Sequence, residues 1–286
     1  MSTAVHAAPP DARLALAHSF LFVPGDRPER YAKACASGAD VVIIDLEDAV
    51  APAAKGAARD ALENWLSSPE GRAPHVPVLV RVNCVNSGCF GDDLILCHRP
   101  GIAGIVLPKA ERVADVASAS SSAPLFPLIE TAQGFANLSQ IVTAPRVQRL
   151  MFGSIDFKLD MGIHGDRDEL LVFRSQIVLA SRLAGLRPPV DGVTLDLGDG
   201  SATEDDARYA HRIGFGGKLC VHPGQLEAVN RAFLPSDEEV AWARRVLAAA
   251  EDARGAAVAV DGKMIDKPVL LLAQRIASEA ARKNLH

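Results

Sequence analysis

The stretch DVVIIDLEDAV, at residues 40–50, begins with an aliphatic run and ends among three acids, Asp45, Glu47 and Asp48. An aliphatic run of this length, bounded by polar residues, is typical of a buried strand of a parallel sheet. Three acids directly after such a strand would repel one another unless they meet cations or hydrogen-bond donors. We therefore expect a buried parallel strand that leads into a polar site, although Asp48 alone could serve as a helix cap.

The same type of run recurs along the chain. Eight of them are SFLFV (19–23), DVVIID (40–45), PVLVRVN (77–83), AGIVLP (103–108), PLFPLIE (124–130), RLMFG (149–153), DGVTLD (191–196) and GKLCV (217–221). The segments between them carry the alanine content and the 3.6-residue apolar spacing of helices. Eight strands alternating with helices predict an α/β protein of the (β/α)₈ TIM-barrel fold. A doubly wound open sheet would need a glycine-rich turn after the first strand, and PGDRPER (24–30) has a single glycine.

Three regions are expected from this pattern. Residues 1–17 are expected to form a flexible tail, residues 18–235 the barrel, and residues 236–286 a C-terminal helical extension or lid. Ser236 and Glu239 have the spacing of a capping box and mark the start of a helix in the extension. The apolar residues of the last helix must bury against the barrel or against a neighbouring subunit.

Composition excludes several classes of function. The 286 residues carry a net charge of −5 with no Lys/Arg-rich stretch, which argues against nucleic-acid binding. No apolar run approaches the ~18 residues of a membrane span, and the N-terminus lacks the features of a signal peptide. The five cysteines are odd in number and include no CxxC, so we expect a reducing, cytoplasmic location.

Polar residues at the ends of the third and fourth strands are candidates for a site, because TIM-barrel active sites lie at the C-terminal ends of the strands. Alternation places Arg81 and Asn83 on one side of the third strand. Arg81 could pair with Asp45 or Glu47 and reach a substrate carboxylate or carbonyl. Lys109 follows the fourth strand; it could form a Schiff base, but we expect a structural charge partner.

Two more carboxylates follow adjacent strands. Glu130 ends the fifth strand and Asp156 comes just beyond the sixth, so both are expected over the same mouth. Two like charges at short range need a cation between them or a shared proton. Mg²⁺ suits a pair of carboxylates completed by water and substrate oxygens, and no His or Cys lies nearby in the sequence to favour zinc. A helix cap for Asp156 and a buried ion pair for Glu130 are the alternative interpretations.

These residues lie in motifs that resemble the citrate lyase β-subunit-like family, part of the HpcH/HpaI aldolase and citrate lyase superfamily that includes malyl-CoA and citramalyl-CoA lyases. The similar stretches run in order over nearly the whole chain after the tail. They are LFVPGDRPERYAKA (21–34), DVVIIDLEDAV (40–50), RVN (81–83), LPK (107–109), IET (129–131), FGSIDFKLDMGI (152–163), GFGGKLCVHPGQ (214–225) and DGKMIDKP (261–268).

The resemblance implies a TIM barrel that uses Mg²⁺, with Mn²⁺ as the alternative metal, and a CoA thioester substrate. It implies that Glu130 and Asp156 hold the metal. It also implies that Arg81 contacts the reacting carbonyl and keto-acid oxygens, oriented by Asp45 and Glu47.

Other positions follow from the same resemblance. Arg27 and Lys33 would face the CoA phosphates, and Asp266 would be the acid/base residue, delivered from the C-terminal segment of a neighbouring subunit. A homo-oligomer, expected to be a trimer, follows. The stretch DLGDGSATEDD (196–206) departs from the family pattern, where an aromatic residue or Arg more often precedes the Asp, so the preferred acyl group stays open.

The implied activity is cleavage of a 3-hydroxyacyl-CoA of the malyl-CoA or citramalyl-CoA type to acetyl-CoA and an α-keto acid, or the reverse condensation. One alternative is a citrate lyase β subunit acting on a carrier-protein thioester. A second is a metal-dependent aldolase for free hydroxy-keto acids, which would not need Arg27 and Lys33. A third, from a different class, is a non-catalytic barrel that binds acyl-CoA and regulates a partner.

Overall fold

The computed structural model describes residues 12–120, 123–197, 200–252 and 258–283. The chain forms two compact units, and the boundary between them in the sequence falls between Asn230 and Arg231. Among the described residues, no helix is long and apolar enough to cross a membrane. The expected regions 18–235 and 236–286 stay a prediction as functional domains.

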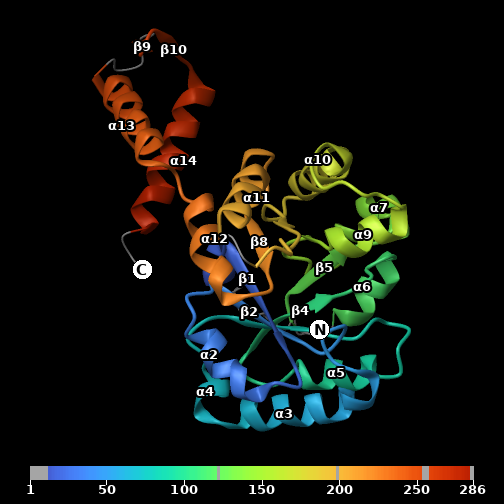
Figure 1. Cartoon of the computed structure of the whole chain (residues 1–286). Coiled ribbons are helices and arrows are strands. Elements are labelled where there is room, and N and C mark those ends of the chain that lie inside the picture. Colours follow the sequence, from blue (N-terminus) through green and yellow to red (C-terminus); the bar gives the residue numbers. More distant parts are fainter. Residues whose placement is uncertain (1–11, 121–122, 198–199, 253–257, 284–286) are drawn as a thin grey trace, which may run out of the picture. The chain divides into compact units, whose positions relative to one another are not determined.

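The first unit is a closed barrel of eight parallel strands in sequence order, β1 to β8, which confirms the TIM-barrel prediction. The strands lie at the centre of this unit with helices around them (Figure 1). They are β1 (Ser19–Pro24), β2 (Val41–Asp45), β3 (Val78–Arg81), β4 (Ile102–Leu107), β5 (Leu125–Ile129), β6 (Met151–Phe152), β7 (Val190–Asp191) and β8 (Gly217–Cys220). Pairing of β8 with β1 closes the barrel.

Helices precede, connect and follow these strands. They are α1 (Ala12–Leu16), α2 (Tyr31–Cys35), α3 (Lys55–Ser67), α4 (Pro69–Arg72), α5 (Phe90–Leu96), α6 (Val113–Ala119), α7 (Ala132–Ala136), α8 (Leu138–Ile141), α9 (Ser154–Met161), α10 (Asp168–Leu183), α11 (Gly200–Arg212) and α12 (Leu226–Phe233). The last of these helices, α12, extends past Asn230, the end of the first unit. Three 3₁₀ turns lie at Pro28–Arg30, Pro52–Ala54 and Pro223–Gln225.

Alternate residues of the strands fill the barrel interior. The interior cluster contains Phe20, Val41, Ile43, Leu79, Val106, Phe126, Leu128, Met151, Val190 and Leu219. The same cluster includes Leu14 and Ala17, which come from the region expected to be a loose tail. Residues 12–17 thus contain the helix α1 and are held on the barrel by the buried side chains of Leu14 and Ala17, while residues 1–11 lie outside the described part of the chain.

The seventh strand differs from the prediction of residues 191–196. It spans only Val190–Asp191, and the residues after it form a loop. Side-chain hydrogen bonds stabilise this loop, where a strand would have backbone hydrogen bonds to its neighbours. The Thr194 hydroxyl donates to Asp206 at 2.7 Å, and the Gln225 amide donates to the Thr194 carbonyl at 2.8 Å. The alternating pattern DGVTLD therefore belongs to a loop whose first residues are buried and whose residues 195–197 are exposed, and local periodicity does not distinguish such a loop from a strand.

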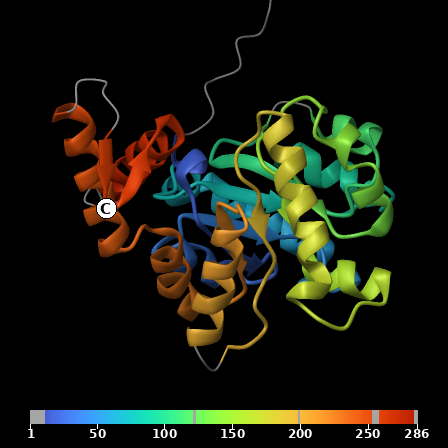
Figure 2. The same cartoon turned by 90° about the horizontal axis from the view of Figure 1, so that it is seen from above.

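The second unit pairs two long helices, α13 (Asp237–Asp252) and α14 (Lys267–Lys283), with a small hairpin of β9 (Val258–Val260) and β10 (Lys263–Ile265) (Figure 2). Its own core contains Ala243, Val246, Ala273 and Ile276. The capping box predicted at its start is confirmed: the Glu239 N–H donates to Ser236 Oγ at 3.1 Å, and the Ser236 N–H donates to Glu239 Oε2 at 2.8 Å.

Interior packing gives a first test. Phe126 is 1% exposed in the barrel cluster, and we expect Phe126→Ala to lower the free energy of unfolding by about 3–5 kcal/mol, because it removes a large apolar side chain and leaves a cavity. Urea unfolding followed by fluorescence measures this in a Trp242→Phe background, where Trp65 of α3 is the sole tryptophan and reports on the barrel. The control Leu183→Ala, at a side chain that is 79% exposed, should change stability by no more than ~0.5 kcal/mol. Equal effects of the two variants would contradict the interior assignment.

Candidate active site

Charged residues continue the inward-facing rows of three strands. Successive alternate positions on β2, β3 and β5 are apolar core residues, and the next positions in the same rows are Asp45, Arg81 and Glu130. Because side chains alternate with a period of two, these three groups point toward the barrel axis at the C-terminal ends of the strands. The structure thus brings together the residues that sequence placed at this mouth.

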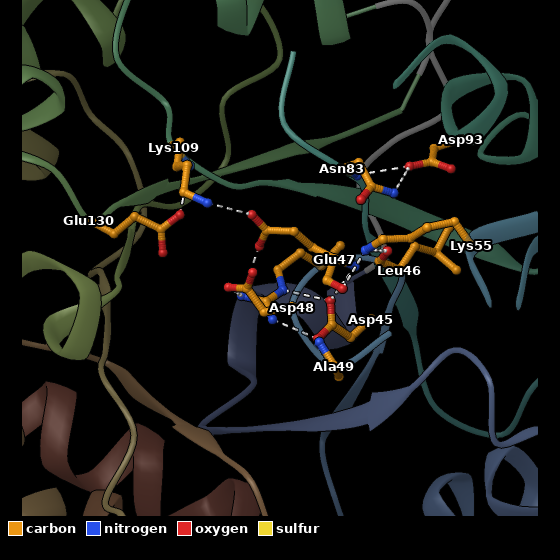
Figure 3. Close-up of polar contacts among 11 residues, drawn as sticks. Asp45, Leu46, Glu47, Asp48, Ala49, Lys55, Asn83, Asp93, Lys109 and Glu130 are labelled. Atoms are coloured by element: carbon orange, nitrogen blue, oxygen red, sulfur yellow. Dashed lines mark hydrogen bonds and ion pairs between the residues drawn. The ribbon is translucent and has the colours of Figure 1, made fainter. Parts of the chain in front are cut away.

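Arg81 and Asp45 form a two-pronged ion pair. Arg81 Nε donates to Asp45 Oδ1 at 2.7 Å and Nη2 donates to Oδ2 at 2.6 Å. Backbone N–H groups of Glu47 and Ala49 also donate to the Asp45 carboxylate, which fixes it (Figure 3). Burial alone would lower the pKa of Arg81, but the bonds and the charge of Asp45 outweigh it and raise the pKa. The guanidinium also lies over the Phe22 ring at 4.8 Å, so its plane is held from two sides.

Glu47 links this pair to Lys109. Its Oε2 lies 3.2 Å from Arg81 Nη1, and its Oε1 accepts a bond of 3.0 Å from Lys109 Nζ (Figure 3). Burial raises the pKa of Glu47, although Arg81 opposes this. Burial would lower the pKa of Lys109, but its bond to Glu47 raises the pKa to about 12. Lys109 thus pairs with Glu47, as expected for a structural charge partner. Lys55 Nζ stabilises the same loop by donating hydrogen bonds to the Leu46 and Glu47 carbonyl oxygens.

Glu130 is the most buried acid at the mouth that has no cationic side chain bonded to it in the described part of the chain. It is 2% exposed, and its Oε1 accepts only the backbone N–H of Lys109, at 2.7 Å. Lys109 adopts a left-handed backbone conformation, with φ of 47°, at the point where its N–H meets the carboxylate. Burial, together with the charges of Glu47 and Asp156, raises the pKa of Glu130 to about 8, while the Lys109 N–H and Arg81 oppose the rise. A neighbouring cation would remove this penalty on the ionised form.

Asp156 completes the acidic side of the mouth. It lies in the first turn of α9, and the N-cap of that helix is Gly153, so Asp156 is not the cap considered from the sequence. Its side chain is half-buried and forms no hydrogen bond or ion pair with any residue that the structure describes. Glu130 senses its charge. Two neighbouring carboxylates with unused oxygens are ligands of the kind that a hard divalent cation takes.

Gly153 lets Glu130 occupy its position. A Cβ on Gly153 would lie 2.5 Å from Glu130 Cβ and 2.6 Å from its Oε2, both impossibly short. Sequence reasoning missed Gly153 and the backbone N–H of Lys109, because neither contributes a functional side chain. A glycine at the end of a strand, between two predicted ligands, was the available signal.

The donor set favours a hard, oxygen-liking metal. No group of three His, Cys, Asp or Glu side chains gathers as a metal site in the described ranges. A cation here would have Glu130 and Asp156 as protein ligands and would complete its shell with water or substrate oxygens. That is the usual way in which proteins hold Mg²⁺.

The remaining predicted residues lie elsewhere. Arg27 follows β1, its side chain is 56% exposed, and its Nε lies 3.8 Å from Asp26 Oδ1. Lys33 is exposed on α2. Asp266 belongs to the second unit, where its Oδ1 accepts the Val269 N–H at 3.1 Å at the start of α14. The roles of these three residues stay predictions.

Fold and site define a TIM-barrel enzyme of the lyase and aldolase type. The model of the HpcH/HpaI aldolase/citrate lyase family matches residues 18–223, and the chain belongs to this family. It is 39% identical over 268 residues to a citrate lyase subunit beta-like protein of Mycobacterium tuberculosis (strain ATCC 25618 / H37Rv), covering 91% of this chain and 94% of the relative. It is 34% identical over 271 residues to a (3S)-malyl-CoA thioesterase of Cereibacter sphaeroides (strain ATCC 17023), covering 92% and 94%.

A solved structure shows the same architecture. The crystal structure of protein CitE from Mycobacterium tuberculosis in complex with magnesium, acetoacetate and coenzyme A superposes with a TM-score of 0.82 at 38% identity, covering 93% of this chain and 99% of that one. The family resemblance read from the motifs is therefore confirmed.

The contact between Gly153 and Glu130 gives a second test. We expect Gly153→Ala to weaken divalent-cation binding at least ~10-fold, because the new methyl group displaces a ligand by more than the site tolerates. Mn²⁺ titration followed by electron paramagnetic resonance measures the affinity. Gly91→Ala, on α5 with open space around the new methyl group, is the matched control and should bind Mn²⁺ as the unaltered chain does. Unchanged Mn²⁺ binding in Gly153→Ala would contradict the assignment of Glu130 as a metal ligand.

Proposed function

We propose that the protein is a divalent-metal-dependent lyase that cleaves a 3-hydroxyacyl-CoA of the malyl-CoA or citramalyl-CoA type to acetyl-CoA and an α-keto acid, or catalyses the reverse condensation. The observation that carries the proposal is the buried Glu130 beside Asp156, which has no bonded partner among the described residues, close to the fixed guanidinium of Arg81. The Mycobacterium CitE structures that contain magnesium with coenzyme A and acetoacetate, or with oxaloacetate, support the choice of metal and substrate class.

Glu130 and Asp156 would hold Mg²⁺, or Mn²⁺ in its place, and the bound ion would polarise the oxygens of the keto-acid half as a Lewis acid. Arg81 is already oriented by Asp45 and Glu47, so it needs no rearrangement to stabilise negative charge that develops on the carbonyl oxygen. Its ion pairs keep the guanidinium plane fixed, which favours one orientation of the substrate.

Cleavage needs a proton to leave the 3-hydroxyl group and a proton to reach the acetyl carbon once the C–C bond breaks. We assign the second transfer to Asp266, a step typically worth ~10²–10⁴ in rate. Arg27 and Lys33, exposed after β1 and on α2, would pair with the phosphates of CoA. We also propose a homotrimer in which the C-terminal extension of one subunit brings Asp266 to the barrel mouth of its neighbour.

The first test of this function removes the unpartnered ligand. We expect Asp156→Asn to lower the rate of malyl-CoA and citramalyl-CoA cleavage about 10³-fold, because the lost Lewis acid is worth several kcal/mol in the transition state. Hydrazone formation measures the keto acid, and free CoA thiol is measured in parallel. Keto acid that appears with Mg²⁺ supports the lyase; CoA thiol without keto acid would show a thioesterase, the activity named for the Cereibacter relative. Binding of acyl-CoA without formation of either product would instead support the non-catalytic, regulatory barrel.

Subunit complementation tests the role of Asp266. We expect Asp266→Asn to lower kcat ~10²–10⁴-fold with little change in KM, because the residue moves a proton and does not bind the ground state. Mixed oligomers of Asp266→Asn and Asp156→Asn chains should recover part of the activity, since some mouths then combine an intact metal site with an intact Asp266. Asp261→Asn, on the exposed hairpin turn, is the control. Full activity of Asp266→Asn would rule out the assignment, and inactive mixtures would place Asp266 at the mouth of its own chain.

A further inference from the structure

A pocket lies in the barrel unit, on the outer side of β7 and β8. It has a volume of about 300 Å³ and is lined by residues of these strands, of the loop after β7, and of helices α9, α10 and α11. Figure 1 shows where these elements lie in the barrel unit. This volume is at the lower end of the range of small-molecule sites, ~300–1,000 Å³. None of the residues assigned above to metal, proton transfer or CoA lines it.

Strand alternation explains why the pocket is polar. Val190 and Leu219 face the apolar barrel interior, so their neighbours Asp191 and Lys218 face outward, toward the helices. Asp191 and Lys218 also pair in register across β7 and β8. The outer face of this part of the barrel therefore begins with one buried acid and one buried amine, side by side.

The acids of the pocket wall are mostly paired with cations other than Lys218. Arg174 Nε donates to Asp191 at 2.9 Å, Arg167 Nη2 lies 2.8 Å from Asp206, and Lys158 Nζ lies 2.7 Å from Asp166. The wall also contains Asp196, but that residue is exposed on the loop after β7, whereas Lys218 is 2% exposed. The wall thus contains four cationic and four acidic side chains, and Lys218 is a buried cation among them without a carboxylate at ion-pair distance in the described part of the chain.

Lys218 has unused donors. Its Nζ donates to the Gly192 carbonyl at 2.7 Å and forms no ion pair with a carboxylate in the described parts of the chain. An ammonium group has three N–H donors, and burying it without a counter-ion carries a large desolvation penalty. A carboxylate that enters the pocket would supply both the charge and the acceptors.

We propose that this pocket binds the carboxylate of a small organic acid, with Lys218 at its floor as the counter-ion. The hydroxyl groups of Thr194 and Tyr209 and the apolar side chains of Val193 and Ile155 provide the mixed lining that a short aliphatic acid fits. Ile155, from the first turn of α9, lines the pocket and directly precedes the candidate metal ligand Asp156 in the sequence. The acid is either a distal carboxylate of the substrate or a separate molecule; only the first source rests on the function proposed above.

Binding of [¹³C]succinate, followed by NMR line broadening and by calorimetry on the full-length, metal-free protein, tests the site directly. Succinate has no keto group, and omission of metal separates this test from the lyase activity. We expect Lys218→Met to weaken binding at least 10-fold. We expect the same of Ala202→Leu, which fills the pocket from α11 without altering Lys218, so a folding defect in one variant leaves the other to decide.

Two controls locate the bound acid. Lys263→Met removes an exposed lysine from the second unit and should not change succinate affinity. Asp156→Asn should also leave metal-free binding intact. Absence of saturable binding, or binding that survives both pocket variants, would overturn the proposal, as would binding that requires Mg²⁺.

Kinetics of Ala202→Leu distinguish the two sources. If the acid is part of the substrate, KM for the cleaved acyl-CoA should rise about 10-fold while kcat changes little. If it is a separate molecule, KM should be unchanged, and succinate should alter the rate of the unaltered enzyme but not of Ala202→Leu. Both results keep the site, and succinate binding remains measurable even if neither acyl-CoA is cleaved.

Discussion

Repulsion among buried carboxylates is the constraint on which the barrel mouth depends. Glu130 is almost fully buried, and the charges of Glu47 and Asp156 act with burial to raise its pKa to about 8. Arg81 and the backbone of Lys109 relieve this only in part, because Arg81 is already committed to Asp45. The negative charge of Glu130 and Asp156 is therefore only partly compensated, and we propose that a divalent cation bound between these two carboxylates compensates the rest.

The barrel supplies the geometry through one regular property, the alternation of its strands. Inward rows that begin with Val41, Leu79 and Phe126 pack the interior, and the same rows end in the charged groups of the site. The rigid packing of the barrel interior thus fixes the charged groups at the C-terminal ends of the strands. Groups held in this way can stabilise charge in a transition state without rearrangement. The outward rows of β7 and β8 place Asp191 and Lys218 against the helices, so one alternation produces both polar sites.

Much of this was predictable from the sequence, for identifiable reasons. Buried aliphatic runs are strong local signals, and residues such as Asp45, Arg81 and Glu130 follow from them by counting along a strand. The alternation of residues 191–196 predicts a strand, whereas the structure forms a loop after Asp191 that is held by long-range bonds of Thr194 with Asp206 and Gln225. Gly153 and the Lys109 N–H act through backbone positions that become neighbours only in the closed barrel, so their roles needed the structure. The roles proposed for Asp266 in a neighbouring subunit and for Arg27 and Lys33 at CoA involve groups outside a single chain.

The measurement that tests the central claim most directly is anomalous diffraction from crystals of the protein grown with Mn²⁺. The account predicts one strong anomalous peak at the barrel mouth, coordinated by carboxylate oxygens of both Glu130 and Asp156, which is lost in Asp156→Asn. A peak held by other residues, or a mouth without a peak at saturating Mn²⁺, would contradict the claim that these two carboxylates form the metal site.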